Sequence, residues 1–237
     1  MTTMLRSLTL FVLAATMAIG AQAPPEKPAP VEKLGPTTYR IGKMQVDTAK
    51  REVVLPGTVN PVTVLEFVAN TPQGIKAYES AFTLEASAVS FNAAMLLIGL
   101  DPARAKPSKM QFDPATPEGD PVDIEVEWKA DGKTRRLKVH EFLFDERTKT
   151  TLADGPWVYT GSTFVDYGDT SGRRYLAESD GILIGLMHGP QPIIENPRSD
   201  AVGGYGAVIL NPKLGLAENT PVTVTIKALP IDRKPKR

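Results

Sequence analysis

Two glutamates, Glu66 and Glu79, are the residues of this chain whose type and spacing could do chemistry. Carboxylates held side by side repel each other, so a fold keeps such a pair only when something compensates the charge. A shared proton would raise one pKa and suit the pair to acid/base hydrolysis, whereas a bridging cation would make it a metal-binding site. The alternative is an ordinary surface on which solvent, Lys76 or another base neutralises both charges.

The elements that must position this pair are two strands and a turn. The β-branched and aromatic residues of 62–69 predict one strand, and residues 75–84 predict a second. The sequence TPQG at 71–74 predicts a turn between them, because Pro presets the second turn position and Gly accepts a positive φ. A hairpin with an even loop then places Glu66 directly opposite Glu79 on one face of two neighbouring strands.

The neighbours of the pair predict that this face is covered by another element. Four apolar residues share the face in the hairpin register: Val64, Val68, Ala77 and Ala81. Covered carboxylates stay charged only when a cation or hydrogen bonds compensate them. In this register Lys76 belongs to the opposite face, so we expect a base from elsewhere, such as Arg104, or a shared proton.

The other chemically active residue types give no competing site. The chain has no Cys and two His, His140 and His188, which removes thiolate chemistry and most zinc sites. Ser162 has no identifiable base, and the aspartates between 166 and 180 lack the spacing of a calcium loop. The 27 basic and 27 acidic residues balance, so nothing indicates a nucleic-acid partner. We predict no metal and no cofactor.

Residues 1–23 have the pattern of a signal peptide. Arg6 supplies a positive start, residues 8–19 form an apolar run, and AQA at 21–23 is a small-x-small cleavage site. The apolar run is shorter than the roughly 20 residues that span a bilayer. We therefore expect cleavage after Ala23 and a periplasmic or extracellular protein without a stable membrane span; an uncleaved anchor is the alternative.

The remainder of the chain predicts one folded domain between two polar ends. Residues 24–36 are rich in Pro, Glu and Lys and predict an extended linker. Residues 37–232 are expected to form a single domain whose core is large enough to stand without disulfides. Residues 233–237 form a basic tail.

The fold class expected from the pattern is mainly β, with antiparallel hairpins and one prominent buried helix near 87–99. Ser87 is a plausible N-cap, Gly99 stands where a helix ends, and the residues between them are largely apolar. No regular alternation of strands and helices is present, which argues against a parallel α/β sheet. Further strands are expected at 157–165, at 173–178 paired with 182–187, and at 222–229.

A second hairpin is predicted around Asp131-Gly132, a pair typical of a type I′ turn. It joins strands 122–129 and 133–143. The resulting register makes three complementary charge pairs, namely Glu127 with Arg136, Glu125 with Lys138 and Asp123 with His140. His140 is therefore interpreted as a surface ion-pair partner.

The segments LPGTVN, LEF, GIK, ES and AAMLLIGLDP occur in that order between residues 53 and 102. In them the chain resembles the YdjY-type domain, a family of exported bacterial proteins without an assigned activity. The segments WVYTGSTF and YLAESDGILIGL, in the β-rich second half at 122–229, also resemble longer members. Tyr78 stands where the family usually has a His. The resemblance implies export and a shared fold, and it transfers no reaction.

The function expected from these observations is a non-catalytic binding or accessory module of the cell envelope, with a small ligand or an envelope component as partner. It rests on the lack of a nucleophile–base set, a metal-ligand cluster and a cofactor loop. The rival hypotheses are an acid/base hydrolase or metal-binding protein using Glu66 and Glu79, and a purely structural envelope protein.

Overall fold

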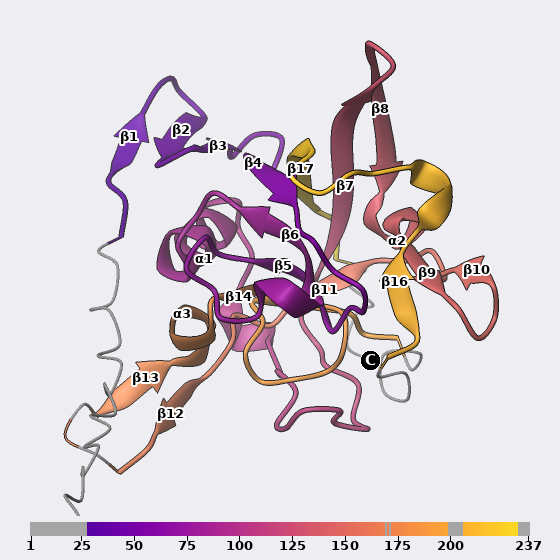
Figure 1. Ribbon diagram of the computed structural model, residues 1–237. Helices are drawn as coiled ribbons and strands as arrows, with labels where there is room; N and C mark the ends of the chain where they lie inside the picture. The colour runs from indigo at the N-terminus through magenta and orange to yellow at the C-terminus, as the bar shows by residue number, and fades with distance from the viewer. Residues whose placement is uncertain (1–27, 169, 171, 199–205, 232–237) are drawn as a thin grey trace, which may run out of the picture.

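Strands dominate the fold (Figure 1). The computed structural model describes residues 28–168, 170, 172–198 and 206–231. In this structure 40% of the chain lies in strands and 14% in helices, which confirms the mainly β class. The expected signal peptide and basic tail lie outside the described residues, and no helix within the described residues is long and apolar enough to cross a membrane.

Eight strands close into a ring, because the last of them pairs back with the first. Around the ring they are β4 (Glu52–Val59), β17 (Pro221–Ala228), β7 (Asp120–Ala130), β11 (Trp157–Tyr159), β15 (Ile194–Glu195), β14 (Ile182–Gly185), β5 (Phe67–Asn70) and β6 (Ser80–Leu84). The pairs β14–β15 and β5–β6 are parallel and the others are antiparallel, so the sheet is mixed. Strand β17, near the end of the chain, lies between β4 and β7 and joins the two halves of the sequence.

The ring closes where β4 meets β6, and a glycine makes that closure possible. A Cβ built on Gly57 would lie 2.6 Å from the Thr83 carbonyl oxygen and 2.6 Å from Leu84 Cδ2. Both distances are far below van der Waals contact, so no larger side chain fits there without moving β6. The Pro-Gly of the LPGTVN segment therefore lies inside strand β4.

The hairpin predicted around 71–74 is wrong. Strand β6 runs parallel to β5, with Phe67 opposite Ser80, and the chain returns to the start of β5 through the short helix η1 (Ala77–Glu79). The TPQG turn binds another part of the molecule instead of closing a hairpin, because Thr71 N donates to the Gly181 carbonyl at 2.8 Å. This tertiary contact decides the direction in which the chain leaves β5.

A buried amide network fixes the parallel pairing. Asn60 Nδ2 donates to Asn70 Oδ1 at 3.0 Å and to the Ser80 carbonyl at 2.9 Å. The Thr83 hydroxyl donates to Asn60 Oδ1 at 2.7 Å. Buried amides are costly without partners, so this network favours one arrangement of β4, β5 and β6.

The second predicted hairpin is confirmed. Strands β7 and β8 (Lys133–Lys138) pair in the expected register, with Glu127 opposite Arg136 and Glu125 opposite Lys138. Asp131 and Gly132 both have positive φ, 52° and 73°, as a type I′ turn requires. The predicted third pair is wrong because β8 ends at Lys138 and the helix α2 (Val139–Phe142) follows.

Aromatic side chains fill the core beside this hairpin. Phe142 of α2 lies edge-on to Trp128 of β7, with ring centroids 5.1 Å apart, and to Phe82 of β6, with centroids 5.8 Å apart. All three residues are buried. Such edge-to-face pairs add to the stabilisation from burial itself.

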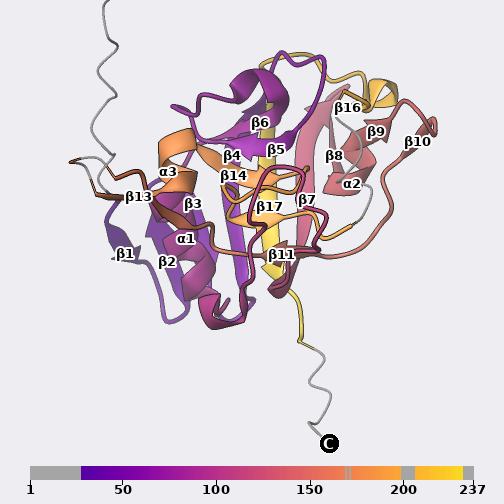
Figure 2. The same cartoon turned by 90° about the horizontal axis from the view of Figure 1, so that it is seen from below.

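The predicted helix is present as α1 (Ala88–Leu97), the only helix of seven or more residues in the part of the chain that the structure describes. The Ser87 hydroxyl accepts a hydrogen bond from Ser90 N as its N-cap, and Gly99 follows the last turn with a φ of +84°. The Arg51 guanidinium donates to the Ile98 carbonyl at 3.0 Å. Contrary to the expectation of full burial, Leu96 and Leu97 in the last turn are exposed, whereas Met95 is buried. The helix packs beside α3, as Figure 2 shows.

Smaller elements flank the ring. The sheet of the ring is extended from β4 by three strands: β3 (Met44–Asp47), β2 (Thr38–Ile41) and β1 (Val31–Lys33). A second sheet consists of β9 (Leu143–Asp145), β10 (Thr150–Thr151) and β16 (Val208–Leu210). A third sheet, which projects from the body in Figure 1, consists of β12 (Phe164–Asp166) and β13 (Arg173–Tyr175). The predicted pairing of 173–178 with 182–187 is wrong, because β13 pairs with β12 and the helix α3 (Leu176–Asp180) follows it. The 157–165 strand is likewise split between β11 and β12. The short helices η2 (Pro102–Arg104) and η4 (Pro212–Leu214) lie in connections.

Candidate functional site

Glu66 lies directly before β5, at the point where three segments of the chain meet. Its backbone N donates to the Glu79 carbonyl at 3.0 Å, and its own carbonyl accepts from Leu186 N at 3.1 Å and from Met187 N at 2.9 Å. Its exposed fraction is 3%. The carboxylate is therefore held at a covered position by backbone bonds on both sides.

Glu79, the last residue of η1, is close to Glu66 and forms an ion pair with Lys76. Lys76 Nζ lies 2.9 Å from Glu79 Oε2, and the exposed fractions of the two side chains are 32% and 14%. The same ammonium lies 5.3 Å from the centroid of the Tyr78 ring. The expectation that Lys76 points away is wrong, because residues 76 to 79 are a helical turn in which positions three apart share a face.

Arg104 is not the base of this cluster. Its guanidinium donates to both oxygens of the buried Asp120 and to Asp101. The arginine therefore serves to fix the start of the 101–120 connection against β7. The sequence offered Arg104 as a nearby cation, but the connection carries it to a different carboxylate.

Gln111 covers Glu66 from the solvent side. Its amide Nε2 lies 3.2 Å from one carboxylate oxygen of Glu66 and 3.4 Å from the other, and the Gln111 side chain is itself exposed. Gln111 belongs to residues 106–118, called here the covering loop. The ends of this loop are joined by two backbone hydrogen bonds between Lys106 and Glu118. We refer to Glu66, Glu79, Lys76 and Gln111 together as the Glu66 cluster.

The environment of the cluster shifts three pKa values. Burial, followed by the charge of Glu79, raises the pKa of Glu66, and Lys76 opposes this. The hydrogen bond to Glu79 raises the pKa of Lys76. Burial raises the pKa of the nearby Asp180, and the charge of Lys76 again opposes the shift. Lys76 therefore lowers the pKa of both Glu66 and Asp180, and a hydrogen bond from Gln191 also lowers that of Asp180, yet both pKa values stay raised.

Exposed apolar side chains flank the cluster in the sequence. Ile75 and Tyr78 are 64% and 59% exposed, and Met110 of the covering loop is 60% exposed. They adjoin Lys76, Glu79 and Gln111 in the chain. Exposed apolar side chains mark a binding surface when they form one contiguous patch, so these three are candidates for ligand contact.

A second buried polar group, which the sequence did not reveal, anchors the covering loop. Glu195 is fully buried; its carboxylate accepts from the Ser108 hydroxyl at 2.6 Å and from Ser108 N at 3.2 Å. Burial raises the pKa of Glu195, and the Ser108 bonds oppose the shift. The buried His188 bonds through Nδ1 to the Asp113 carbonyl at 2.7 Å, so Nδ1 carries the proton. Glu195 and His188 look like ordinary strand and loop residues in the sequence, since only the fold brings the loop onto them.

The remaining residues singled out in the sequence have structural roles. His140 Nδ1 lies 3.3 Å from Asp154 Oδ1 rather than beside Asp123. The Ser162 hydroxyl accepts from Ala177 N at 3.1 Å and donates to the Pro190 carbonyl at 3.3 Å, which ties a loop together. No group of three or more His, Asp or Glu side chains suited to a metal ion occurs among the described residues.

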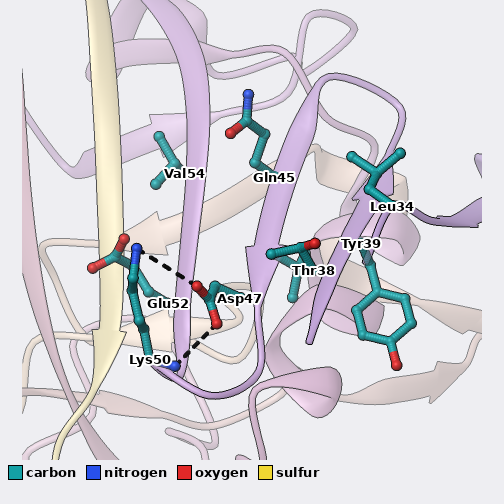
Figure 3. Close-up of a pocket in the computed structure, with 9 residues that line it drawn as sticks. Leu34, Thr38, Tyr39, Gln45, Asp47, Lys50, Glu52 and Val54 are labelled. Carbon is teal, nitrogen blue, oxygen red and sulfur yellow. Dashed lines mark hydrogen bonds and ion pairs between the residues drawn. The ribbon is translucent and has the colours of Figure 1, made fainter. Parts of the chain in front are cut away.

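Two surface hollows lie elsewhere. One of about 160 Å³ is formed on β2, β3 and β4. Figure 3 shows Asp47 among the residues that line it; its carboxylate accepts from Lys50 N at 3.1 Å and pairs with Lys50 Nζ at 3.6 Å. The other, of about 300 Å³, lies between the β2–β3 turn and the start of α1. Neither hollow includes Glu66 or Glu79, which are covered by their own neighbours.

The fold and the site together define a class of protein: a closed, mixed β-sheet with a covered carboxylate under a polar loop. The chain belongs to the YdjY domain family, whose model matches residues 44–227. The match extends well beyond the 53–102 segment that carried the resemblance and includes β17, which completes the ring. No curated protein and no solved structure gives a significant match.

Proposed function

We propose that the protein is an exported, non-catalytic binding module of the cell envelope, and that its ligand is recognised at the Glu66 cluster. The observation that carries the proposal is Glu66 itself. Its carboxylate is almost fully buried, yet the hydrogen bonds described for it from Gln111 are long, at 3.2 and 3.4 Å. A buried carboxylate of this kind is costly for the fold unless a further group compensates it.

The charge balance supports a ligand contribution. Glu66 and Glu79 bring two carboxylates, and Lys76 brings one ammonium that is engaged by Glu79. The cluster therefore lacks one positive charge or one proton when both glutamates are ionised. A ligand with a positive or hydrogen-donating group can supply what the chain does not.

The position of the cluster also supports binding. Gln111 is an exposed side chain on a loop, so it can move away from Glu66 without disturbing the ring. The loop itself stays attached through Ser108 and its paired ends, Lys106 and Glu118. Ile75 and Met110, which adjoin Lys76 and Gln111 in the chain, are exposed and can offer apolar contacts to a ligand.

An acid/base hydrolase is the second candidate function. The observation in its favour is the different state of the two carboxyls, since the pKa of Glu66 is raised while Glu79 is ion-paired with Lys76. Hydrolases use such a pair as a proton donor and a charged partner. Glu66 is 3% exposed, so a scissile bond would reach its carboxylate only after the covering loop has moved.

A thermal-shift screen of the purified exported protein tests the proposal. The panel contains sugars, divalent cations, amines and peptidoglycan fragments. We expect at least one compound to raise the melting temperature of the wild type saturably and to have no effect on Glu66→Gln. Glu127→Gln is the matched control, because it makes the same substitution on the β7–β8 hairpin, where Glu127 pairs with Arg136 at 2.7 Å. A ligand that stabilises Glu66→Gln as well as the wild type would contradict the proposed site.

A further inference from the structure

The cluster already holds one ammonium group that belongs to the chain. Lys76 Nζ is bound by the Glu79 carboxylate at 2.9 Å and lies 5.3 Å from the Tyr78 ring centroid. A carboxylate together with an aromatic face is a common environment for a primary ammonium. The Lys76 side chain therefore shows what the cluster can bind, namely an ammonium on an aliphatic stem.

Glu66 presents a second carboxylate, and a neutral group now contacts it. The Gln111 amide nitrogen approaches both carboxylate oxygens, at 3.2 and 3.4 Å, but an amide brings no charge. Charge-assisted hydrogen bonds are shorter and about twice as strong as neutral ones. An ammonium at this position would compensate the carboxylate better than the amide does.

The surroundings of this second position favour an aliphatic amine over a metal ion. A divalent cation needs several oxygen ligands, and no group of three or more acidic or His side chains suited to a metal occurs among the described residues. A primary ammonium needs fewer partners, since it is a compact charge with three donors. Met110 is next to Gln111 in the chain and Ile75 is next to Lys76, and both side chains are exposed, so they are available to contact a methylene stem.

We infer that the Glu66 cluster recognises a primary ammonium carried on an aliphatic stem, which displaces the Gln111 side chain and pairs with Glu66 beside Lys76. This inference rests on the proposed binding function and names the chemical class of its ligand. A lysine-like side chain of a peptide has this chemistry, as has a free alkylamine.

The first experiment places the ammonium within the chain. Gln111→Lys should raise the melting temperature at pH 7 by several degrees, about 2–4 °C for each kcal/mol in a protein of this size. The gain should vanish when Glu66→Gln is introduced as well. Met110→Lys is the matched control, because it adds the same charge to the neighbouring exposed position, and it should give no gain that depends on Glu66. An equal gain from both lysine variants, or no gain from Gln111→Lys, would overturn the inference.

The second experiment supplies the ammonium from solution. The n-butylammonium ion should raise the melting temperature of the wild type saturably, and n-butanol and tetramethylammonium should not. The effect should be larger in Gln111→Ala, which removes the competing amide, and absent in Glu66→Gln and Gln111→Lys. Equal effects of butylammonium and butanol, or an effect that persists in Glu66→Gln, would count against an ammonium position on Glu66.

The two ideas fail differently. If a sugar or a divalent cation binds in a Glu66-dependent way while butylammonium does not, the binding function stands and the ammonium inference is overturned. If no compound of the panel binds and Gln111→Lys gives no Glu66-dependent gain, both are overturned.

Discussion

Replacing Glu66 and Glu79 one at a time should change the stability in opposite directions. Glu66→Gln removes a carboxylate that is buried and repelled by Glu79 while keeping the shape of the side chain. Like charges held side by side at a protein surface destabilise by roughly 0.2–0.5 kcal/mol, and burial of the charge adds to this cost. We therefore expect Glu66→Gln to be neutral or more stable by up to about 1 kcal/mol at pH 7, a rise in melting temperature of about 2–4 °C.

Glu79→Gln should lower the stability, because it removes the carboxylate that binds the Lys76 ammonium. Hydrogen bonds to charged groups contribute about 1.5–3 kcal/mol. Part of this is recovered when Lys76 turns to Glu66, so we expect a net loss of about 1 kcal/mol. Glu127→Gln, which breaks the more exposed pair with Arg136, should cost less than this.

The pH dependence gives a sharper test of the Glu66 effect. The pKa of Glu66 is raised in the fold above its ordinary value of 4.5, so the folded state holds the proton more tightly than the unfolded chain. The destabilisation is therefore absent below the ordinary value and develops as the pH rises through the folded pKa. The difference between Glu66→Gln and the wild type should be near zero at pH 4 and largest at neutral pH.

The assay is urea unfolding of the three variants and the wild type between pH 4 and pH 8, followed by circular dichroism. A sharp loss of stability in Glu66→Gln at pH 7 would refute the reasoning, because it would make Glu66 the charged partner of Lys76. A constant difference at all pH values would show that the pKa of Glu66 is the same in the folded and unfolded states, so no shift exists.

Three further predictions concern the fold and export. Gly57→Ala should lower the free energy of unfolding by about 1–3 kcal/mol, because its Cβ would lie 2.6 Å from the backbone of β6. Gly132→Ala, at a positive φ with open space around it, should lower it by about 1 kcal/mol. Urea unfolding measures both. Phe142→Ala should cost about 3–5 kcal/mol and Phe164→Ala, at an exposed position, far less by the same measurement. N-terminal sequencing of the exported protein should begin directly after Ala23, and a mature chain that begins at Met1 would contradict the export proposal.

The elements that could be predicted from the sequence are those that local rules determine. The β7–β8 hairpin has a two-residue turn whose residues, Asp131 and Gly132, suit only one turn type, and its charge pairs agree with that register. The helix α1 has its own N-cap in Ser87 and its own terminating glycine in Gly99. In both elements the neighbours in sequence are also the neighbours in space.

The elements that could not be predicted depend on distant parts of the chain. The turn at 71–74 forms, but its backbone binds Gly181, so β6 becomes parallel to β5 instead of pairing back with it. The 173–178 segment divides into β13 and α3 for a similar reason, because β13 pairs with β12. The pattern of residues in a strand predicts which face of the strand is buried. It does not predict which other strand pairs with it.

Glu66 and Glu79 are close together in the structure although the hairpin predicted to bring them together is wrong. In a hairpin, Glu66 and Glu79 would meet as cross-strand partners on one face. In the structure they meet because Glu66 N donates to the Glu79 carbonyl where the parallel pair β5–β6 begins. The two arrangements share the pairing of these backbones and differ in the helical turn before Glu79, which places Lys76 beside the carboxylates. Only the structure identifies Lys76 as the base that compensates the carboxylates. The ammonium inference depends on this identification.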